Sequence, residues 1–154
     1  MISRVDQDKV KAAFVDALKI RGFELFKRSG FFKWMDQEVY LAQSEDLSGV
    51  MFIRAESEEK DGTGWMLNEE MFVSFRDMAA EDKDTGLYVV LLENEGNGFL
   101  LNGEEFDGVR EGFKKNDKGN YFVDRNVIRE KFLANSFAKS EEFFLKLNAA
   151  HKGA

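Results

Sequence analysis

Apolar residues recur along the chain at a spacing that predicts which segments are helical. In five segments neighbouring apolar positions are three or four residues apart, which places them on one face of an α-helix. These predicted helices cover residues 5–21, about 69–81, 104–113, 125–133 and 140–150. Gly22 stands where the first helix is expected to end, because glycine is common immediately after a helix.

Residues 22–55 are dense in aromatic and β-branched side chains and are interrupted by short polar turns. This pattern predicts consecutive antiparallel strands joined by tight turns. The predicted strands cover residues 22–28, 31–35, 38–44, 49–55, 87–93, 99–101 and 121–123. Residues 56–64 are polar and are predicted to form a surface loop. Residues 65–82 stay open between a helix and a strand through Met66 that becomes helical afterwards, with a helix over about 69–81 favoured.

Together these segments predict an α+β fold, because runs of strands are flanked by helices. We expect a mostly antiparallel sheet of five or six strands, built from the meander 22–55 and the pair 87–101. The N-terminal, central and C-terminal helices are expected to pack mainly on one face of this sheet. The 154 residues fit a single domain spanning residues 1–154, in which residues 151–154 are expected to fray.

The net charge of −7 is distributed unevenly along the chain. Residues 1–41 carry a net charge of +2, residues 42–108 a net charge of −13, and residues 109–154 a net charge of +4. The strongly acidic middle should repel nucleic acid and attract basic protein surfaces. The chain has no cysteine, which fits a cytoplasmic location, and no apolar run of about 20 residues that would span a membrane.

The acidic middle therefore predicts a small, non-enzymatic interaction domain that binds a basic protein surface, as an inhibitor, immunity protein, adaptor or DNA mimic does. The acids are densest between the turn at Glu45 and the loop that ends at Asp61, and a tryptophan follows that could anchor an interface. The predicted partner-binding residues are Glu45, Asp46, Glu56, Glu58, Glu59, Asp61 and Trp65. The partner's identity and the oligomeric state stay open at this point.

The chain offers little for catalysis by histidine or by a bound metal. His151 is the sole histidine and lies close to the C-terminus, where nothing is expected to orient it as a general base. We expect no cofactor and no metal. Carboxylates with a lysine leave one enzymatic alternative, because Asp46 followed by Glu58 and Lys60 resembles the acid and acid-x-Lys pattern of PD-(D/E)XK nucleases. The alternative is therefore a Mg²⁺-dependent or degenerate nuclease-like domain.

A second alternative rests on basic residues near the C-terminal third of the chain. Basic side chains interleaved with aromatic ones can neutralise phosphates and stack bases. Tyr121 and Phe122 lie among such residues, and the basic candidates are Arg110, Lys114, Lys115, Lys118 and Arg125. The sequence therefore leaves a nucleic-acid-binding module over residues 110–125 as an alternative, which the acidity of the whole chain opposes.

Overall fold

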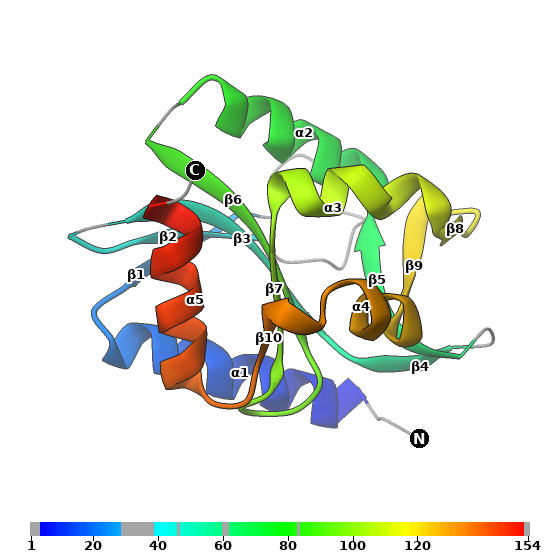
Figure 1. Cartoon of the computed structure of the whole chain (residues 1–154), viewed down its shortest axis with the longest axis horizontal. Coiled ribbons are helices and arrows are strands. Elements are labelled where there is room, and N and C mark those ends of the chain that lie inside the picture. Colours follow the sequence, from blue (N-terminus) through cyan, green and yellow to red (C-terminus); the bar gives the residue numbers. More distant parts are fainter. Residues whose placement is uncertain (1–3, 29–38, 46, 60–61, 83, 153–154) are drawn as a thin grey trace.

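The protein has an α+β fold in which two β-sheets are packed together with α-helices (Figure 1). The computed structural model describes residues 4–28, 39–45, 47–59, 62–82 and 84–152. Within this part of the chain the helices are α1 (Arg4–Ile20), α2 (Glu69–Ala80), α3 (Gly103–Val109), α4 (Arg125–Lys131) and α5 (Ser140–Lys152). Short 3₁₀ turns follow two of them, η1 (Arg110–Gly112) after α3 and η2 (Leu133–Asn135) after α4. The fold class predicted from the sequence is confirmed.

The larger sheet has the strand order β1-β2-β3-β6-β7-β10 in the described residues. Its strands are β1 (Glu24–Arg28), β2 (Val39–Gln43), β3 (Ser48–Ala55), β6 (Thr85–Leu92), β7 (Gly98–Asn102) and β10 (Ser136–Phe137). All neighbours pair antiparallel except β3 and β6, which are parallel from Ser48↔Thr85 to Ala55↔Leu92. A parallel pair needs a long crossover, and residues 56–84 supply it. The prediction of a mostly antiparallel sheet is confirmed.

The crossover contains structure that the sequence did not predict. Residues 57–59 and 62–64 pair as antiparallel strands, β4 (Ser57–Glu59) with the start of β5 (Gly62–Asn68), so the surface loop predicted over residues 56–64 is wrong for these residues. β5 then pairs with β9 (Asn120–Asp124), and β8 (Lys114–Lys115) completes a smaller sheet with the order β4-β5-β9-β8. The open question at residues 65–82 is answered, because the chain is a strand through Asn68 and helical from Glu69. The side chain of Asn68 caps α2 by accepting a hydrogen bond from the Met71 amide.

The meander predicted over residues 22–55 differs in its pairing. β1 pairs directly with β2, in a register from Glu24↔Gln43 to Arg28↔Val39. The strand predicted at 31–35 lies outside the described residues, and no described strand separates β1 from β2.

Helices cover both faces of the larger sheet, which corrects the prediction that they pack mainly on one. Along β6, Leu87, Val89 and Leu91 face a core shared with α2, α3, α4 and the smaller sheet. The alternate residues, Tyr88, Val90 and Leu92, face a second core that α1 and α5 close. Figure 1 shows α1 and α2 on opposite sides of the strands. The continuously apolar sequence of β6 reflects this burial on both faces.

The C-terminal helix α5 extends further than the sequence predicted. It continues through Lys152, two residues into the segment 151–154 that was expected to fray, and residues 153–154 lie outside the described part. Phe143, Phe144 and Leu147 are buried against the second core and anchor α5 there. Across the described ranges, no helix is both long enough and apolar enough to cross a membrane.

Candidate functional site

The predicted partner-binding acids do not converge on one surface. Glu45 is exposed in the turn before β3, whereas Glu58 and Glu59 are exposed on β4, beyond the other end of β3. An eight-residue strand is about 25 Å long, so the two groups lie far apart. Asp46 and Asp61 lie outside the described residues.

Trp65, which the sequence suggested as an interface anchor, is a core residue. Its side chain is 0% exposed, and its ring meets that of Phe99 edge-on with centroids 6.1 Å apart. The indole Nε1–H donates a hydrogen bond to the Leu92 carbonyl oxygen over 3.0 Å. Trp65 therefore joins the smaller sheet to the larger one, and its burial leaves no surface for a partner to contact.

The acids and the lysine of the nuclease alternative cannot be assembled from the described residues. Asp46 and Lys60 lie outside them, and Glu58 lies on β4 rather than on a strand of the larger sheet. On β3 itself the cation is Arg54, whose Nε donates to the Met66 carbonyl, and the buried Phe52 stands where the motif has its acid. In the described ranges no three His, Cys, Asp or Glu side chains group as a metal site.

Most of the basic residues of the nucleic-acid alternative are neutralised by acids. Arg110 bonds to Asp107, Lys115 Nζ lies 3.0 Å from Glu69, and Arg125 Nη1 lies 3.4 Å from Glu56. Lys114 and Lys118 are exposed. Because three of the five cations already have carboxylate partners, this surface carries less free positive charge than its sequence suggests.

A polar network around the Tyr121 hydroxyl connects the start of α2 to η1 and β9. The hydroxyl donates to Glu69 Oε2 and accepts a hydrogen bond from Arg110 Nη1 over 2.8 Å. The hydrogen bonds from Tyr121 and Lys115 lower the pKa of Glu69, so the carboxylate stays ionised. Tyr121 is buried, whereas Lys115 is exposed.

Replacing Tyr121 with phenylalanine should lower the free energy of unfolding by about 1–3 kcal/mol, because Glu69 and Arg110 both lose a partner there. Urea denaturation measures this loss. Lys115→Gln is the comparison, since it removes an exposed ion pair and should cost less than about 1 kcal/mol. Equal losses in the two variants would contradict a structural role for the hydroxyl.

Two acids follow the carboxyl ends of the parallel strands, and α4 covers both. Glu56 follows β3 and Glu93 follows β6, side by side because Ala55 pairs with Leu92. Arg125 and Arg129, four residues apart on α4, bond to them over 3.4 and 2.6 Å respectively. Neighbouring strands are about 4.8 Å apart, and residues i and i+4 of a helix are about 6 Å apart. Arg125 and Arg129 are therefore spaced closely enough for each to reach one of the two acids.

Glu56 is the buried member of this pair of ion pairs. The residue is 7% exposed, and its Oε2 has no hydrogen-bond partner in the described part of the chain. Burial raises the pKa of Glu56, the negative charge of Glu93 adds to this, and Arg125 opposes it. In open sheets the carboxyl ends of parallel strands commonly bind ligands, and in this protein the arginines of α4 occupy that position.

The raised pKa of Glu56 predicts a dependence of stability on pH. Above pH 4.5 the folded state keeps a proton that the unfolded state releases, so this group lowers the free energy of unfolding as the pH rises through its folded pKa. Glu56→Gln should therefore gain stability relative to the wild type as the pH is raised from 4.5 to neutral. Arg125→Ala should lose stability over the same range, because the buried carboxylate then lacks its cation.

Urea denaturation at several pH values measures both differences. A Glu56→Gln variant whose stability relative to the wild type is constant, or declines, as the pH rises would contradict the burial argument.

The densest exposed negative charge lies on α2, on the turn after it, on α3 and on η1. We call this surface the acidic face. Glu70 and Asp77 on α2 and Glu81 at its C-cap follow one another at intervals of seven and four residues, which places them on the same side of the helix. The acidic face consists of Glu70, Asp77, Glu81, Asp82, Asp84, Glu104, Asp107 and Glu111.

The helices α2 and α3 lie side by side (Figure 1). The rings of Phe72 and Phe106 pack with centroids 4.8 Å apart, and Arg76 on α2 reaches Asp107 on α3 over 3.0 Å. Residues 69–84 carry six acids and two bases, and residues 103–112 four acids and one base, so these two segments together hold a charge of −7. That equals the net charge of the whole chain.

Internal contacts engage the arginines of this surface. Arg76 and Arg110 both bond to Asp107, and these bonds lower the pKa of Asp107. In the described ranges, no cation lies within ion-pair distance of Glu70, Glu81, Asp84, Glu104 or Glu111. Acids at helical spacing in the sequence are the signal for this surface. The acids are denser over residues 45–61, and the prediction was therefore placed there.

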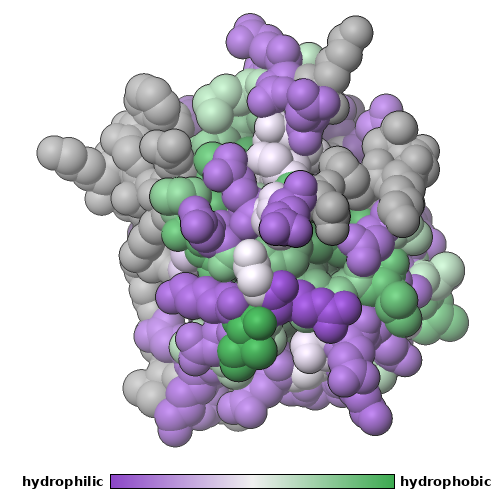
Figure 2. Space-filling model, turned by 90° about the vertical axis from the view of Figure 1, so that its left-hand side faces the viewer, coloured by the Kyte–Doolittle hydropathy of each residue, from purple (hydrophilic) through white to green (hydrophobic). Residues whose placement is uncertain are grey.

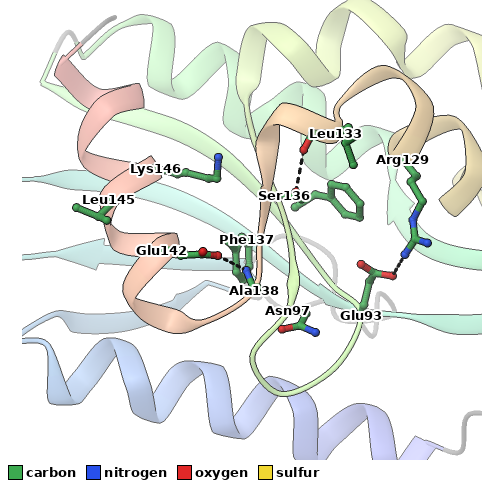
Figure 3. Close-up of a pocket in the computed structure, with 11 residues that line it drawn as sticks. Glu93, Asn97, Arg129, Leu133, Ser136, Phe137, Ala138, Glu142, Leu145 and Lys146 are labelled. Atoms are coloured by element: carbon green, nitrogen blue, oxygen red, sulfur yellow. Dashed lines mark hydrogen bonds and ion pairs between the residues drawn. The ribbon is translucent and has the colours of Figure 1, made fainter.

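An open pocket lies beside β10 and is lined by residues of α4, η2 and α5 (Figure 3). Its volume is about 700 Å³, within the range of small-ligand sites. Glu93, Arg129, Glu142 and Lys146 supply its charges, two of each sign. The remaining lining residues are Asn97, Phe99, Leu133, Ser136, Phe137, Ala138 and Leu145.

The comparisons with known proteins add no functional information. The chain matches no protein-family model, and no curated protein is similar to it in sequence.

Proposed function

We propose that the protein is a small acidic interaction domain that acts without catalysis and binds a basic protein surface through the acidic face. The observation that carries this proposal is the row of exposed carboxylates on two adjacent helices, several of them without a neutralising cation in the described part of the chain. Such a surface attracts a basic partner over a distance and orients it on approach.

The shape of the charge distribution supports a protein or DNA-mimic role more than binding of a small cation. Glu70, Asp77 and the C-cap residue Glu81 are spaced by about 6–10 Å along the axis of α2, so they present an extended row rather than a cage around one ion. The hydrogen bonds that Asp82 accepts from Thr85 and the Asp84 amide lower its pKa, so the turn stays charged at neutral pH. Inhibitors, immunity proteins, adaptors and DNA mimics all use surfaces of this kind.

Figure 2 shows the left-hand side of the molecule as it is drawn in Figure 1, and among the coloured residues hydrophilic ones dominate and hydrophobic ones form separate small patches. The described residues on this side therefore present no broad apolar patch to a partner. Binding driven by charge is the better match, and it should weaken as salt is added.

A pull-down from a native extract at low salt tests the proposal. The full chain should retain a protein with a basic surface, and salt should release it. The variant Glu70→Lys, Asp77→Lys, Glu81→Lys should retain little of that protein. Recovery of the same protein in equal amounts by this variant would overturn the proposal.

A further inference from the structure

One exposed side of α5 carries an acid, Glu142, a leucine, Leu145, and a base, Lys146. Leu145 is 69% exposed, although it is a large apolar side chain. Glu142 accepts a hydrogen bond from the Ala138 amide over 2.6 Å, and Lys146 Nζ donates to the Ala134 carbonyl over 2.7 Å. Both charges are thus held in place by backbone groups, and in the described ranges neither has an oppositely charged partner.

We infer that a second copy of this chain occupies the pocket beside β10, with the two α5 helices antiparallel across a two-fold axis. Glu142 and Lys146 are four residues apart, so they lie on the same side of α5. An antiparallel arrangement centred between them places Glu142 of each copy opposite Lys146 of the other. The same two residues thereby form two ion pairs, which is the self-complementarity that a two-fold interface requires.

The pocket provides an apolar site for Leu145 of the second copy. Phe99 and Phe137 line it and are buried, while Leu133 is 64% exposed at its edge. In Figure 3, Leu145 and Lys146 project from α5 on one side of the pocket, and Leu133 and Arg129 lie on the other. Insertion of Leu145 of the second copy beside Leu133 removes both side chains from water, which favours association.

Charge favours binding of a second copy at this pocket over binding at the acidic face. The acidic face would repel another copy, whereas the pocket has two acids and two bases and so carries no net charge. α5 packs on the face of the larger sheet opposite α2 and α3. The dimer therefore leaves both acidic faces accessible, and it presents them to partners as a pair.

Sedimentation velocity of the full chain over a wide range of concentrations tests the inference. The contact is small, so a weak dimer that dissociates on dilution is the expected result. Leu145→Asp should abolish it. Glu142→Lys and Lys146→Glu alone should each weaken it about tenfold or more, because each turns both ion pairs into like-charge contacts. The double variant Glu142→Lys, Lys146→Glu should restore it, because the exchange recreates both pairs.

Met78→Asp is the matched control, since Met78 is 53% exposed on α2, away from the pocket. It should leave dimerisation unchanged, and far-UV circular dichroism verifies that each variant is folded. A wild-type chain that stays monomeric at every concentration would overturn the inference. So would a dimer that survives Leu145→Asp, or single charge reversals that the double variant does not rescue.

Discussion

Replacing Trp65 with alanine is expected to lower the free energy of unfolding by about 3–5 kcal/mol, the range typical of removing a large buried aromatic side chain. The indole is fully buried where the smaller sheet meets the larger one, and its loss leaves a cavity there. The Leu92 carbonyl also loses its hydrogen-bond donor. Urea denaturation followed by circular dichroism measures the loss.

Two comparison variants separate the contributions at this position. Trp65→Phe keeps most of the apolar contact and loses the N–H donor, so it should cost less than the alanine variant. Met78→Ala removes an exposed apolar side chain and should change stability by less than about 1 kcal/mol. A Trp65→Ala variant that keeps wild-type stability but loses partner binding would show that Trp65 is an interface residue, contrary to its burial.

Reversing three charges on α2 should weaken partner binding by about 100- to 1000-fold. Glu70→Lys, Asp77→Lys and Glu81→Lys together change the charge of the acidic face by six units. Electrostatic steering alone contributes about 10–10³-fold to association rates, so most of the loss should appear in the association rate. Surface plasmon resonance with the captured partner measures both rate constants, at low and at high salt.

A matched variant carries the same change of charge away from the acidic face. Glu45, Glu95 and Glu130 are exposed and lie on other elements, so their replacement by lysine should weaken binding far less. A third variant, Glu58→Lys with Glu59→Lys, tests the segment that the sequence singled out. If that variant, rather than the one on α2, abolishes binding, the functional surface is the β4–β5 hairpin.

Local signals predicted the helices and the central strands well. α2 begins at Glu69 because Asn68 caps it, and its apolar residues Met71, Phe72 and Phe75 recur at helical spacing. β6 and β7 form a hairpin, since a polar turn separates two apolar runs. Each of these elements depends on residues close in sequence, so a single chain is sufficient to recognise them.

The pairing of strands that are distant in sequence could not be predicted from the pattern of apolar and polar residues. β4 is three residues long and polar, and it is a strand because β5 pairs with it, not because of its own composition. The parallel alignment of β3 and β6 depends on a crossover of about thirty residues, which no local signal specifies. Glu56 and Glu93 meet only through that alignment.

The candidate site also depends partly on local signals and partly on long-range contacts. Density of acids along the chain pointed to residues 45–61, but β3 separates Glu45 from Glu58, and Glu56 is buried against Arg125. The acidic face instead joins two helices that are about thirty residues apart in sequence. Spacing on α2 predicts its row of acids, whereas the neighbouring row on α3 becomes apparent once Phe72 packs on Phe106.

The location of the interface is the most direct test of the proposed function. Amide chemical-shift mapping of the isotope-labelled full chain, titrated with the captured partner, reports which residues the partner contacts. We expect shifts centred on α2, the turn after it and α3, and few on β4 or in the turn at Glu45. Shifts centred on Glu45, on the β4–β5 hairpin or on the basic residues 110–125, with α2 unaffected, would contradict it.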